Sequence, residues 1–241
     1  MLRVHSTESF GTHEGPGIRF VLFLQGCLFK CLYCHNPDTI SLTEGSLMEV
    51  DSIVEKVVKM KSYFANSWWF TVSGGEPLLQ AAELLPLFQK LKAEWIHIAL
   101  DTNGFVRNTD VEALLPYVDL VLLDIKHMDN ALHEKLTGKP NQPVHFFLEQ
   151  LERLQKPTWI RYVFVPQYSD QLEHIAALGQ KFGSCSCIQR VEILPYHRLG
   201  EYKWKELWWK YELDGVETPS QESLIQAKNL LAESFKEVYI R

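Results

Sequence analysis

Six short apolar runs alternate with amphipathic stretches along this chain of 241 residues, and this alternation constrains the fold most strongly. The runs have the length and composition of strands buried on both faces. The stretches between them have helical spacing, as Ile53, Val57 and Met60 illustrate. Repeated strand–helix units predict a parallel sheet with right-handed crossovers, either a six-stranded barrel, partial or closed, or an open doubly wound sheet. The predicted strands are Ile18–Leu24, Trp69–Ser73, Ile96–Thr102, Leu120–Ile125, Trp159–Val165 and Ile188–Leu194, and the predicted helices are Val50–Phe64, Leu79–Ala93, Asp110–Leu115, Asn130–Leu136, Val144–Leu154, Ser169–Phe182 and Ser220–Ser234.

Composition narrows the class of protein further. With 46% hydrophobic and 22% charged residues, the chain is expected to be a soluble globular protein with a substantial core. A net charge of −6 argues against general binding to nucleic acids or anionic membranes. The N-terminus has no apolar segment of signal-peptide length, and no run is long enough to span a membrane. Five cysteines, an odd number, favour a reducing cytoplasm over a disulfide framework.

Polar residues follow most of the predicted strands at their carboxyl ends. Ser73–Pro77, Asp101–Gly104, Asp124–Lys126 and Pro195–His197 all occupy such positions, and a cysteine-rich loop follows the first strand. In parallel α/β folds the functional site is built at this edge of the sheet. The five segments therefore predict one shared site.

The cysteine-rich loop contains Cys27, Cys31 and Cys34 in a C-x3-C-x2-C arrangement, with no fourth cysteine nearby. Structural zinc sites and electron-transfer clusters usually take four protein ligands. Three thiolates leave one metal position open to a substrate or cofactor, which favours a [4Fe–4S] cluster with one open iron. The alternatives are a zinc site or three unrelated thiols. A zinc site would need a fourth ligand, and His35, adjacent to Cys34, is poorly placed to provide it.

The run from Gly15 to Phe20, followed by Gly26-Cys27-x3-Cys31-x2-Cys34-His35-Asn36, resembles the radical S-adenosylmethionine (SAM) enzymes, and among them the activases of glycyl radical enzymes. The segments Leu100–Phe105, Trp159–Val163, Leu194–Gly200 and Leu213–Val216 extend the resemblance to the pyruvate formate-lyase branch of these activases. The chain lacks the ferredoxin-like insert of many other activases, which also favours that branch. The resemblance implies a partial (β/α)6 TIM-like barrel with a radical SAM core.

The resemblance also implies the cofactors and their binding residues. The cysteines would hold the cluster, and the amino and carboxylate groups of SAM would chelate the open iron. A second metal, a monovalent cation such as Na⁺ or K⁺, is implied at Asp101, Thr102, Leu122 and Asp124. For Arg161 the alternatives are contact with SAM, contact with a peptide substrate, or a pair with a core acid. The SAM-binding residues implied by the resemblance are Tyr33, Cys34, His35, Gly74, Gly75, Glu76, Thr102, Asp124, Ile125, Lys126, Arg161 and His197.

The activity implied by the family is removal of a glycine Cα hydrogen from a large protein substrate. The expected partners are pyruvate formate-lyase as the glycine-loop substrate and a flavodoxin or ferredoxin as the reductant, all cytoplasmic. The alternatives are an activase of another glycyl radical enzyme, such as anaerobic ribonucleotide reductase, a radical SAM enzyme with a small-molecule substrate, and a non-catalytic iron–sulfur or zinc module.

The remaining features of the sequence lie outside the predicted cofactor site. Cys185 and Cys187 are interpreted as incidental thiols. The bulky run Ser67–Phe70 departs from the small residues expected before the second strand and suggests core packing. Tyr202–Tyr211 predicts either a docking surface for a protein or an amphipathic cover helix. We expect one domain over residues 1–241, with a cluster loop at 26–36 and a C-terminal cover or docking region from about 198 to 241.

Overall fold

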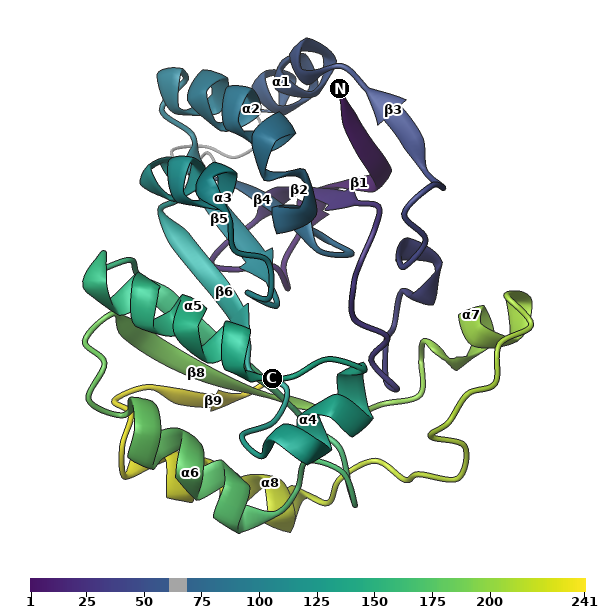
Figure 1. The fold of residues 1–241 in the computed structure, drawn as a ribbon, viewed down its shortest axis with the longest axis vertical. Helices are drawn as coiled ribbons and strands as arrows, with labels where there is room; N and C mark the ends of the chain where they lie inside the picture. Colours follow the sequence, from purple (N-terminus) through teal and green to yellow (C-terminus); the bar gives the residue numbers. More distant parts are fainter. Residues whose placement is uncertain (61–68) are drawn as a thin grey trace. The chain divides into compact units, whose positions relative to one another are not determined.

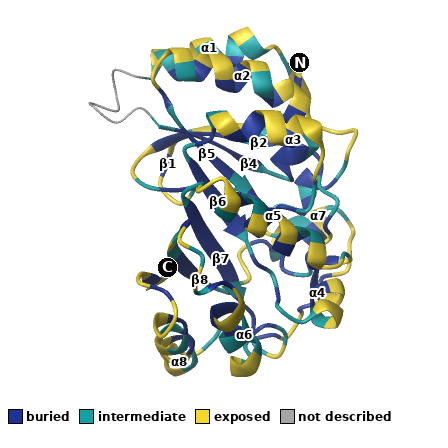
Figure 2. Ribbon diagram, turned by 60° about the vertical axis from the view of Figure 1, so that its left-hand side comes forward, coloured by how far each residue is buried: buried dark blue, intermediate teal, exposed yellow. Residues whose placement is uncertain are grey.

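The computed structural model describes residues 1–60 and 69–241 and confirms the six predicted strands (Figure 1). The interior positions of these strands are largely buried, which is why continuous apolar runs identified them (Figure 2). The six strands are β2 (Arg19–Leu24), β4 (Trp69–Gly74), β5 (His97–Thr102), β6 (Leu120–Asp124), β7 (Thr158–Phe164) and β8 (Ile188–Pro195).

The described residues form a nine-stranded sheet in the order β3-β1-β2-β4-β5-β6-β7-β8-β9. The additional strands are β1 (Leu2–Gly11), β3 (Ser46–Met48) and β9 (Val238–Ile240). β1 is antiparallel to β2 and β3, whereas β2–β4, β4–β5, β7–β8 and β8–β9 are parallel pairs. The sheet is mixed but mostly parallel, and it is not closed, because β3 and β9 are the two ends of the order.

The three additional strands lack the signal that identified the other six. In β1 only Leu2, Val4 and Gly11 are buried, and its central residues are exposed. An antiparallel strand with one solvated face needs no continuous apolar run. β3 and β9 have three residues each, too few for a periodic pattern.

The helices agree with the predicted segments. Asn108, Asp129 and Ser220 cap three of them, each accepting a hydrogen bond from a backbone N–H in the first turn. Residues 61–64 of the first predicted helix, and Ser67 and Trp68 of the aromatic run, lie outside the described residues. The helices are α1 (Val50–Lys59), α2 (Ala81–Ala93), α3 (Thr109–Leu114), α4 (Asn130–Thr137), α5 (Gln142–Arg153), α6 (Leu172–Phe182) and α8 (Gln221–Ala232), with α7 (Glu201–Glu206) in addition, and the 3-10 turns are η1 (Pro37–Thr39), η3 (Pro77–Gln80) and η4 (Leu115–Tyr117). No helix in the described part of the chain is both long and apolar enough to cross a bilayer.

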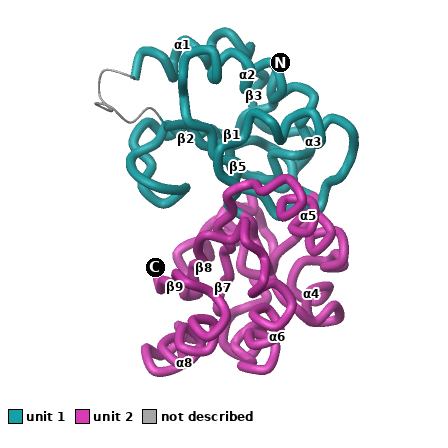
Figure 3. Tube along the Cα trace, turned by 90° about the vertical axis from the view of Figure 1, so that its left-hand side faces the viewer, with its two compact units in different colours: residues 1–27, 39–122 teal, residues 28–38, 123–241 magenta. Residues whose placement is uncertain are grey.

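The chain divides into two compact units (Figure 3). The first comprises residues 1–27 and 39–122, and its core includes Ile53, Leu84 and Phe88. The second comprises residues 28–38 and 123–241, and its core includes Phe147, Ile193 and Leu231. The organisation as one domain stays a prediction.

The second unit buries two imidazoles on adjacent helices. His133 in α4 and His145 in α5 are 1% and 7% exposed. Burial lowers the pKa of each to about 4, because desolvation disfavours the imidazolium, and for His145 the Lys181 ammonium 2.8 Å from Nδ1 adds to the effect. Each imidazole is therefore neutral in the folded chain at pH 7.

These imidazoles predict a loss of stability in mild acid. An unfolded histidine titrates near 6.5, so the unfolded chain takes up protons first as the pH falls. The free energy of unfolding should decrease from about pH 6.5 down to about pH 4, by roughly 3 kcal/mol for each histidine. In His145→Gln the decrease, measured by urea unfolding at several pH values, should be shallower. The control Phe147→Leu should lower stability at every pH without changing the slope. Parallel pH curves for His145→Gln and the unsubstituted chain would contradict the assignment.

Candidate functional site

Backbone hydrogen bonds fix the start of the cysteine-rich loop in the first unit. Gly26 follows β2 with φ = 102°, a value that favours glycine, and its N–H donates to Thr39 O at 2.8 Å. The Cys27 N–H donates to Ile40 O at 3.2 Å, and Asn103 Nδ2 donates to the Cys27 sulfur at 3.8 Å. The first thiol therefore has a fixed backbone and a side-chain donor from the end of β5.

The other two thiols of the triplet belong to the second unit. Lys30 and Leu32 donate their N–H groups to Thr137 O and Leu136 O, each at 2.9 Å, which anchors the loop to the end of α4. The Cys34 N–H then donates to Cys31 O at 3.0 Å. All five cysteines of the chain are described, and all are thiols.

Burial makes Cys31 and Cys34 difficult to ionise without a bound cation. Desolvation raises the pKa of Cys31 to about 12 and also raises the pKa of Cys34. A metal centre deprotonates its thiol ligands and supplies the positive charge that burial removes. A metal bound to Cys31 and Cys34 would therefore lower the pKa of both thiols and leave them ionised.

The glycine-rich segment after β4 packs against the end of β2. Gly74 has φ = 109°, and a Cβ on it would lie 2.3 Å from Leu24 N. A Cβ on Gly75 would lie 2.2 Å from Gly26 O. Backbone donors reinforce the contact, from Gly75 N–H to Leu24 O at 2.9 Å and from Glu76 N–H to Gly26 O at 2.7 Å. The two glycines therefore let this segment pack directly against the start of the cysteine-rich loop.

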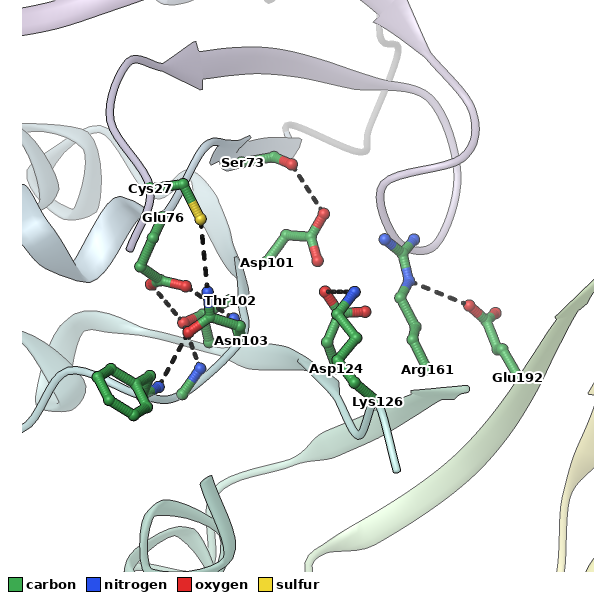
Figure 4. A network of polar contacts seen from close by, with 12 residues as sticks. Cys27, Ser73, Glu76, Asp101, Thr102, Asn103, Asp124, Lys126, Arg161 and Glu192 are labelled. Carbon is green, nitrogen blue, oxygen red and sulfur yellow. Dashed lines mark hydrogen bonds and ion pairs between the residues drawn. The ribbon is translucent and has the colours of Figure 1, made fainter. Parts of the chain in front are cut away.

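Glu76 joins the ends of β4 and β5 through a buried carboxylate, 1% exposed (Figure 4). It accepts hydrogen bonds from Leu78 N–H at 3.0 Å, Thr102 Oγ1 at 2.6 Å and Asn103 N–H at 2.8 Å. Each is stronger than a neutral bond because the acceptor is charged. Glu76 thereby fixes the backbone of Asn103, whose side chain reaches Cys27.

The residues predicted to bind a monovalent cation have protein partners of their own. In the first unit Ser73 Oγ donates to Asp101 Oδ2 at 2.8 Å, Thr102 donates to Glu76, and Leu122 is fully buried in β6. In the second unit Asp124 Oδ2 lies 2.8 Å from Lys126 Nζ. Cation binding at these residues stays a prediction.

Lys126 is a buried cation next to an aromatic ring. Its ammonium lies 5.5 Å from the centroid of Tyr33, within range of a cation–π contact. Burial disfavours the charge, but the Asp124 carboxylate together with Tyr33 and Cys31 raises the pKa of Lys126 well above its usual value. Lys126 is therefore charged, with the Asp124 carboxylate as its ion-pair partner. The buried Tyr33 hydroxyl has no hydrogen-bond partner within the described residues.

Two histidines far apart in sequence pack against one another with their rings tilted by 34°. The rings of His35 and His197 have centroids 4.1 Å apart, and His35 Nε2 lies 3.2 Å from His197 O. Burial lowers the pKa of both rings, so both are neutral at pH 7 and present flat aromatic faces. Gly200 permits the contact, since a Cβ there would lie 2.6 Å from His35 Cα.

Arg161 pairs with a buried acid, which was one of the alternatives for this residue. Its Nε lies 3.4 Å from Glu192 Oε2, and Glu192 is 1% exposed (Figure 4). Its carbonyl also accepts from Ile125 N–H at 3.0 Å, so β7 supports the segment after β6. The ion pair does not test whether Arg161 also contacts SAM.

Three residues that contact predicted site residues were not themselves predicted. Asn103 stands in a matched motif, so its position alone could have identified it, whereas Glu192 and Trp204 carry no motif. Trp204 Nε1 donates to Cys34 O at 2.8 Å. Within the segment Tyr202–Tyr211, Trp204 and Tyr211 are buried while Tyr202 and Trp208 are exposed, so one face packs and the other is solvated.

The Cys187 N–H donates to Glu152 Oε2 at 2.9 Å, a contact with α5 that involves no part of the cysteine-rich loop.

Comparison with known proteins agrees with these features. The pattern described as the radical SAM superfamily matches residues 21–179, more than half of the chain. A pyruvate formate-lyase-activating enzyme of Staphylococcus epidermidis is 47% identical over 232 residues, covering 93% of this chain and 92% of that protein. One from Staphylococcus aureus is 47% identical over 229 residues, covering 92% and 91%. The chain belongs to the radical SAM superfamily, in the family of pyruvate formate-lyase-activating enzymes.

Solved structures show the same fold. A domain of a pyruvate-formate lyase-activating enzyme from Bacteroides vulgatus superposes with a TM-score of 0.60 at 24% identity, covering 71% of this chain and 97% of that one. SuiB of Streptococcus suis superposes with a TM-score of 0.69 at 15% identity, covering 90% of this chain and 47% of that one. At these identities the likeness concerns the fold alone.

Membership of the family identifies the protein as an enzyme that uses a [4Fe–4S] cluster and SAM. The spacing of Cys27, Cys31 and Cys34 agrees with this. In the described residues no group of three His, Cys, Asp or Glu side chains is arranged to hold a single metal ion. A cluster with three cysteine ligands does not need three side chains around one metal ion, because each thiolate would bind a different iron atom.

Substitution of Glu76 tests the connection between β4 and β5. Glu76→Gln places an amide N–H₂ where the carboxylate faces three donors, so a buried donor loses its acceptor. The free energy of unfolding in urea should fall by about 2 kcal/mol. The same change at the exposed Glu83 should cost less than about 0.5 kcal/mol. Equal stability of the two variants would contradict the assigned role.

Substitution of Gly75 tests the close approach to the cysteine-rich loop. Gly75→Ala puts a methyl group 2.2 Å from Gly26 O, and separating two backbones should cost about 2–3 kcal/mol. Gly215→Ala is the control, since φ is 81° but nothing lies within 4 Å, so left-handed strain alone should cost about 1 kcal/mol. Urea unfolding compares them, and a smaller loss for Gly75→Ala would contradict the packing argument.

Proposed function

We propose that this enzyme activates pyruvate formate-lyase by generating a glycyl radical on it. The observation that carries the proposal is the 47% identity to proteins named pyruvate formate-lyase-activating enzyme, extending over more than nine-tenths of both chains. Similarity of this extent covers the cysteine triplet and the strand-end motifs together, not the cofactor-binding loop alone.

The proposed cluster ligands are Cys27, Cys31 and Cys34. The amino and carboxylate groups of SAM would coordinate the fourth iron, which has no cysteine ligand. When bound, the reduced cluster supplies the electron that cleaves SAM to methionine and a 5′-deoxyadenosyl radical, which then removes a glycine Cα hydrogen atom. The backbone hydrogen bonds that anchor the loop of Cys31 and Cys34 to the end of α4 support their role, because they hold this part of the loop in place.

The chain itself binds, orients and shields the reactants. The segment Gly74–Glu76 is proposed to hold the SAM amino group, and the charged Lys126 to face an anionic group of SAM. His35 and His197, whose rings are in contact, offer with Tyr33 aromatic surfaces suited to an adenine ring. The further proposed contacts are Thr102, Asp124, Ile125 and Arg161, and the proposed monovalent cation site is Asp101, Thr102, Leu122 and Asp124.

The partners follow from the same proposal. The protein substrate is pyruvate formate-lyase, which offers a glycine-containing loop, and the electron donor is a flavodoxin or ferredoxin. Because oxygen destroys a glycyl radical and a reduced cluster needs an electron donor, we place the enzyme in the reducing cytoplasm.

Anaerobic reconstitution tests the proposal. The enzyme with iron, sulfide, SAM and a reductant should produce methionine, and adding pyruvate formate-lyase should give a glycyl radical signal in the EPR spectrum. The variants Cys27→Ala, Cys31→Ala and Cys34→Ala should each abolish SAM cleavage, because one iron loses its ligand. The control Cys187→Ala, which removes a thiol as buried as that of Cys31, should retain SAM cleavage.

Each failure has a distinct meaning. If Cys187→Ala loses iron like Cys34→Ala, the ligand set is wrong. If SAM is cleaved but no radical forms on pyruvate formate-lyase, the substrate is wrong and the enzyme class remains. A radical formed instead on anaerobic ribonucleotide reductase would assign the enzyme to that alternative.

A further inference from the structure

A short helix near the C-terminus makes polar contacts with the cysteine-rich loop and with the turn that follows it, all within the second unit. The helix is α7, Glu201–Glu206 (Figure 1). Trp204 Nε1 donates to Cys34 O at 2.8 Å, between residues 170 positions apart in the sequence. Lys203 Nζ donates to Asn36 Oδ1 at 2.9 Å and pairs with Asp38 Oδ2 at 3.0 Å. The helix thus contacts the loop at its third cysteine and at the residues that follow.

The indole that reaches Cys34 is itself held by an aromatic cluster. Trp204 is 6% exposed and meets the ring of Trp209 edge-on at 6.0 Å and that of Tyr211 at 5.6 Å. The Tyr211 hydroxyl hydrogen-bonds the Tyr196 hydroxyl at 2.7 Å, and Tyr196 directly follows β8. Trp204 and Tyr211 are buried and in contact, which limits the rotation of the Trp204 side chain and keeps its N–H directed at Cys34 O.

The backbone around Cys34 is consequently held from both sides. Its N–H donates to Cys31 O within the loop, and its carbonyl accepts from Trp204. A buried carbonyl without such a donor would carry a free-energy penalty. The next residue, His35, lies against Gly200, immediately before α7, where a Cβ would lie 2.6 Å from His35 Cα. The helix and its preceding glycine therefore fit the path of the loop closely.

We propose that Trp204 and Lys203 are positioning residues that hold the cluster-binding loop in the geometry its thiols require. The inference rests on the proposed role of Cys34 as a cluster ligand. Groups that orient metal ligands without touching the metal typically change metal affinity or activity 10- to 100-fold when they are removed. Trp204 acts on the backbone of the ligand, and Lys203 fixes the chain two and four residues further on.

The test compares two conservative substitutions in the same aromatic cluster. Trp204→Phe keeps a ring but removes the N–H that reaches Cys34, and the matched control Trp209→Phe makes the same change where the indole only packs on Trp204. The first readout is hydrogen–deuterium exchange of peptides covering residues 28–38 in the protein without cluster. The second is the rate at which a chelator removes iron from the reconstituted enzyme. Thermal unfolding of each variant establishes that it is folded.

Removal of the N–H should speed both exchange in the loop and iron loss by about three- to tenfold, the factor that corresponds to one net hydrogen bond. Trp209→Phe should stay within about twofold of the unsubstituted enzyme in both. Lys203→Gln changes a half-buried side chain outside the aromatic cluster and should also speed exchange. Lys203→Arg keeps the positive charge and should restore much of the protection. This second pair decides the question if Trp204→Phe does not fold.

The outcomes separate this inference from the function on which it rests. If the unsubstituted enzyme binds iron and cleaves SAM, and Trp204→Phe and Lys203→Gln behave like Trp209→Phe, the positioning role is wrong and the proposed function stands. If the unsubstituted enzyme and Trp209→Phe bind no iron after reconstitution, the proposed function fails and this inference fails with it.

Discussion

The parallel pairing of β2 with β4 is the constraint on which the rest of the site depends. Its register runs to the last residue of each strand, with Leu24 opposite Gly74. The pairing sets the cysteine-rich loop and the glycine-rich segment side by side as they leave the sheet, and only glycine fits where the two backbones meet. Parallel strands end at one edge, so two segments some 50 residues apart become neighbours without any direct attraction between them.

Hydrogen-bonded and ion-paired side chains, buried or largely buried, connect the strand ends. Glu76 gathers three donors from the start of η3 and the end of β5, Lys126 pairs with Asp124, and Arg161 pairs with Glu192. A buried charge is tolerated only when it is paired and hydrogen-bonded, and removing one partner leaves the other unsatisfied. These pairs contribute fixed geometry more than stability, and fixed geometry is what a radical reaction needs from its protein.

The accuracy of the sequence-based predictions follows from how local each signal is. All six apolar strands were found because burial on both faces requires a continuous apolar run. β1 was missed because an antiparallel strand with a solvated face mixes polar with apolar residues. The cysteine spacing and the strand-end motifs were identified because each is a short run of residues whose types and spacing fit few functions. Arg161 could not be decided, since its partner Glu192 lies on another strand and carries no motif.

The sequence by itself determined the alternation of strands and helices, the ligand types in the cysteine-rich loop, and the family. These depend on residue identity and short-range spacing, which the chain displays directly. Only the tertiary structure decided that Asn103 reaches Cys27 and that Trp204 holds the Cys34 carbonyl, because a hydrogen bond between residues 170 positions apart requires both backbones to be placed first. A tryptophan in an aromatic, charged segment has the same appearance in the sequence whether it faces a partner, the solvent or the third cysteine of the loop.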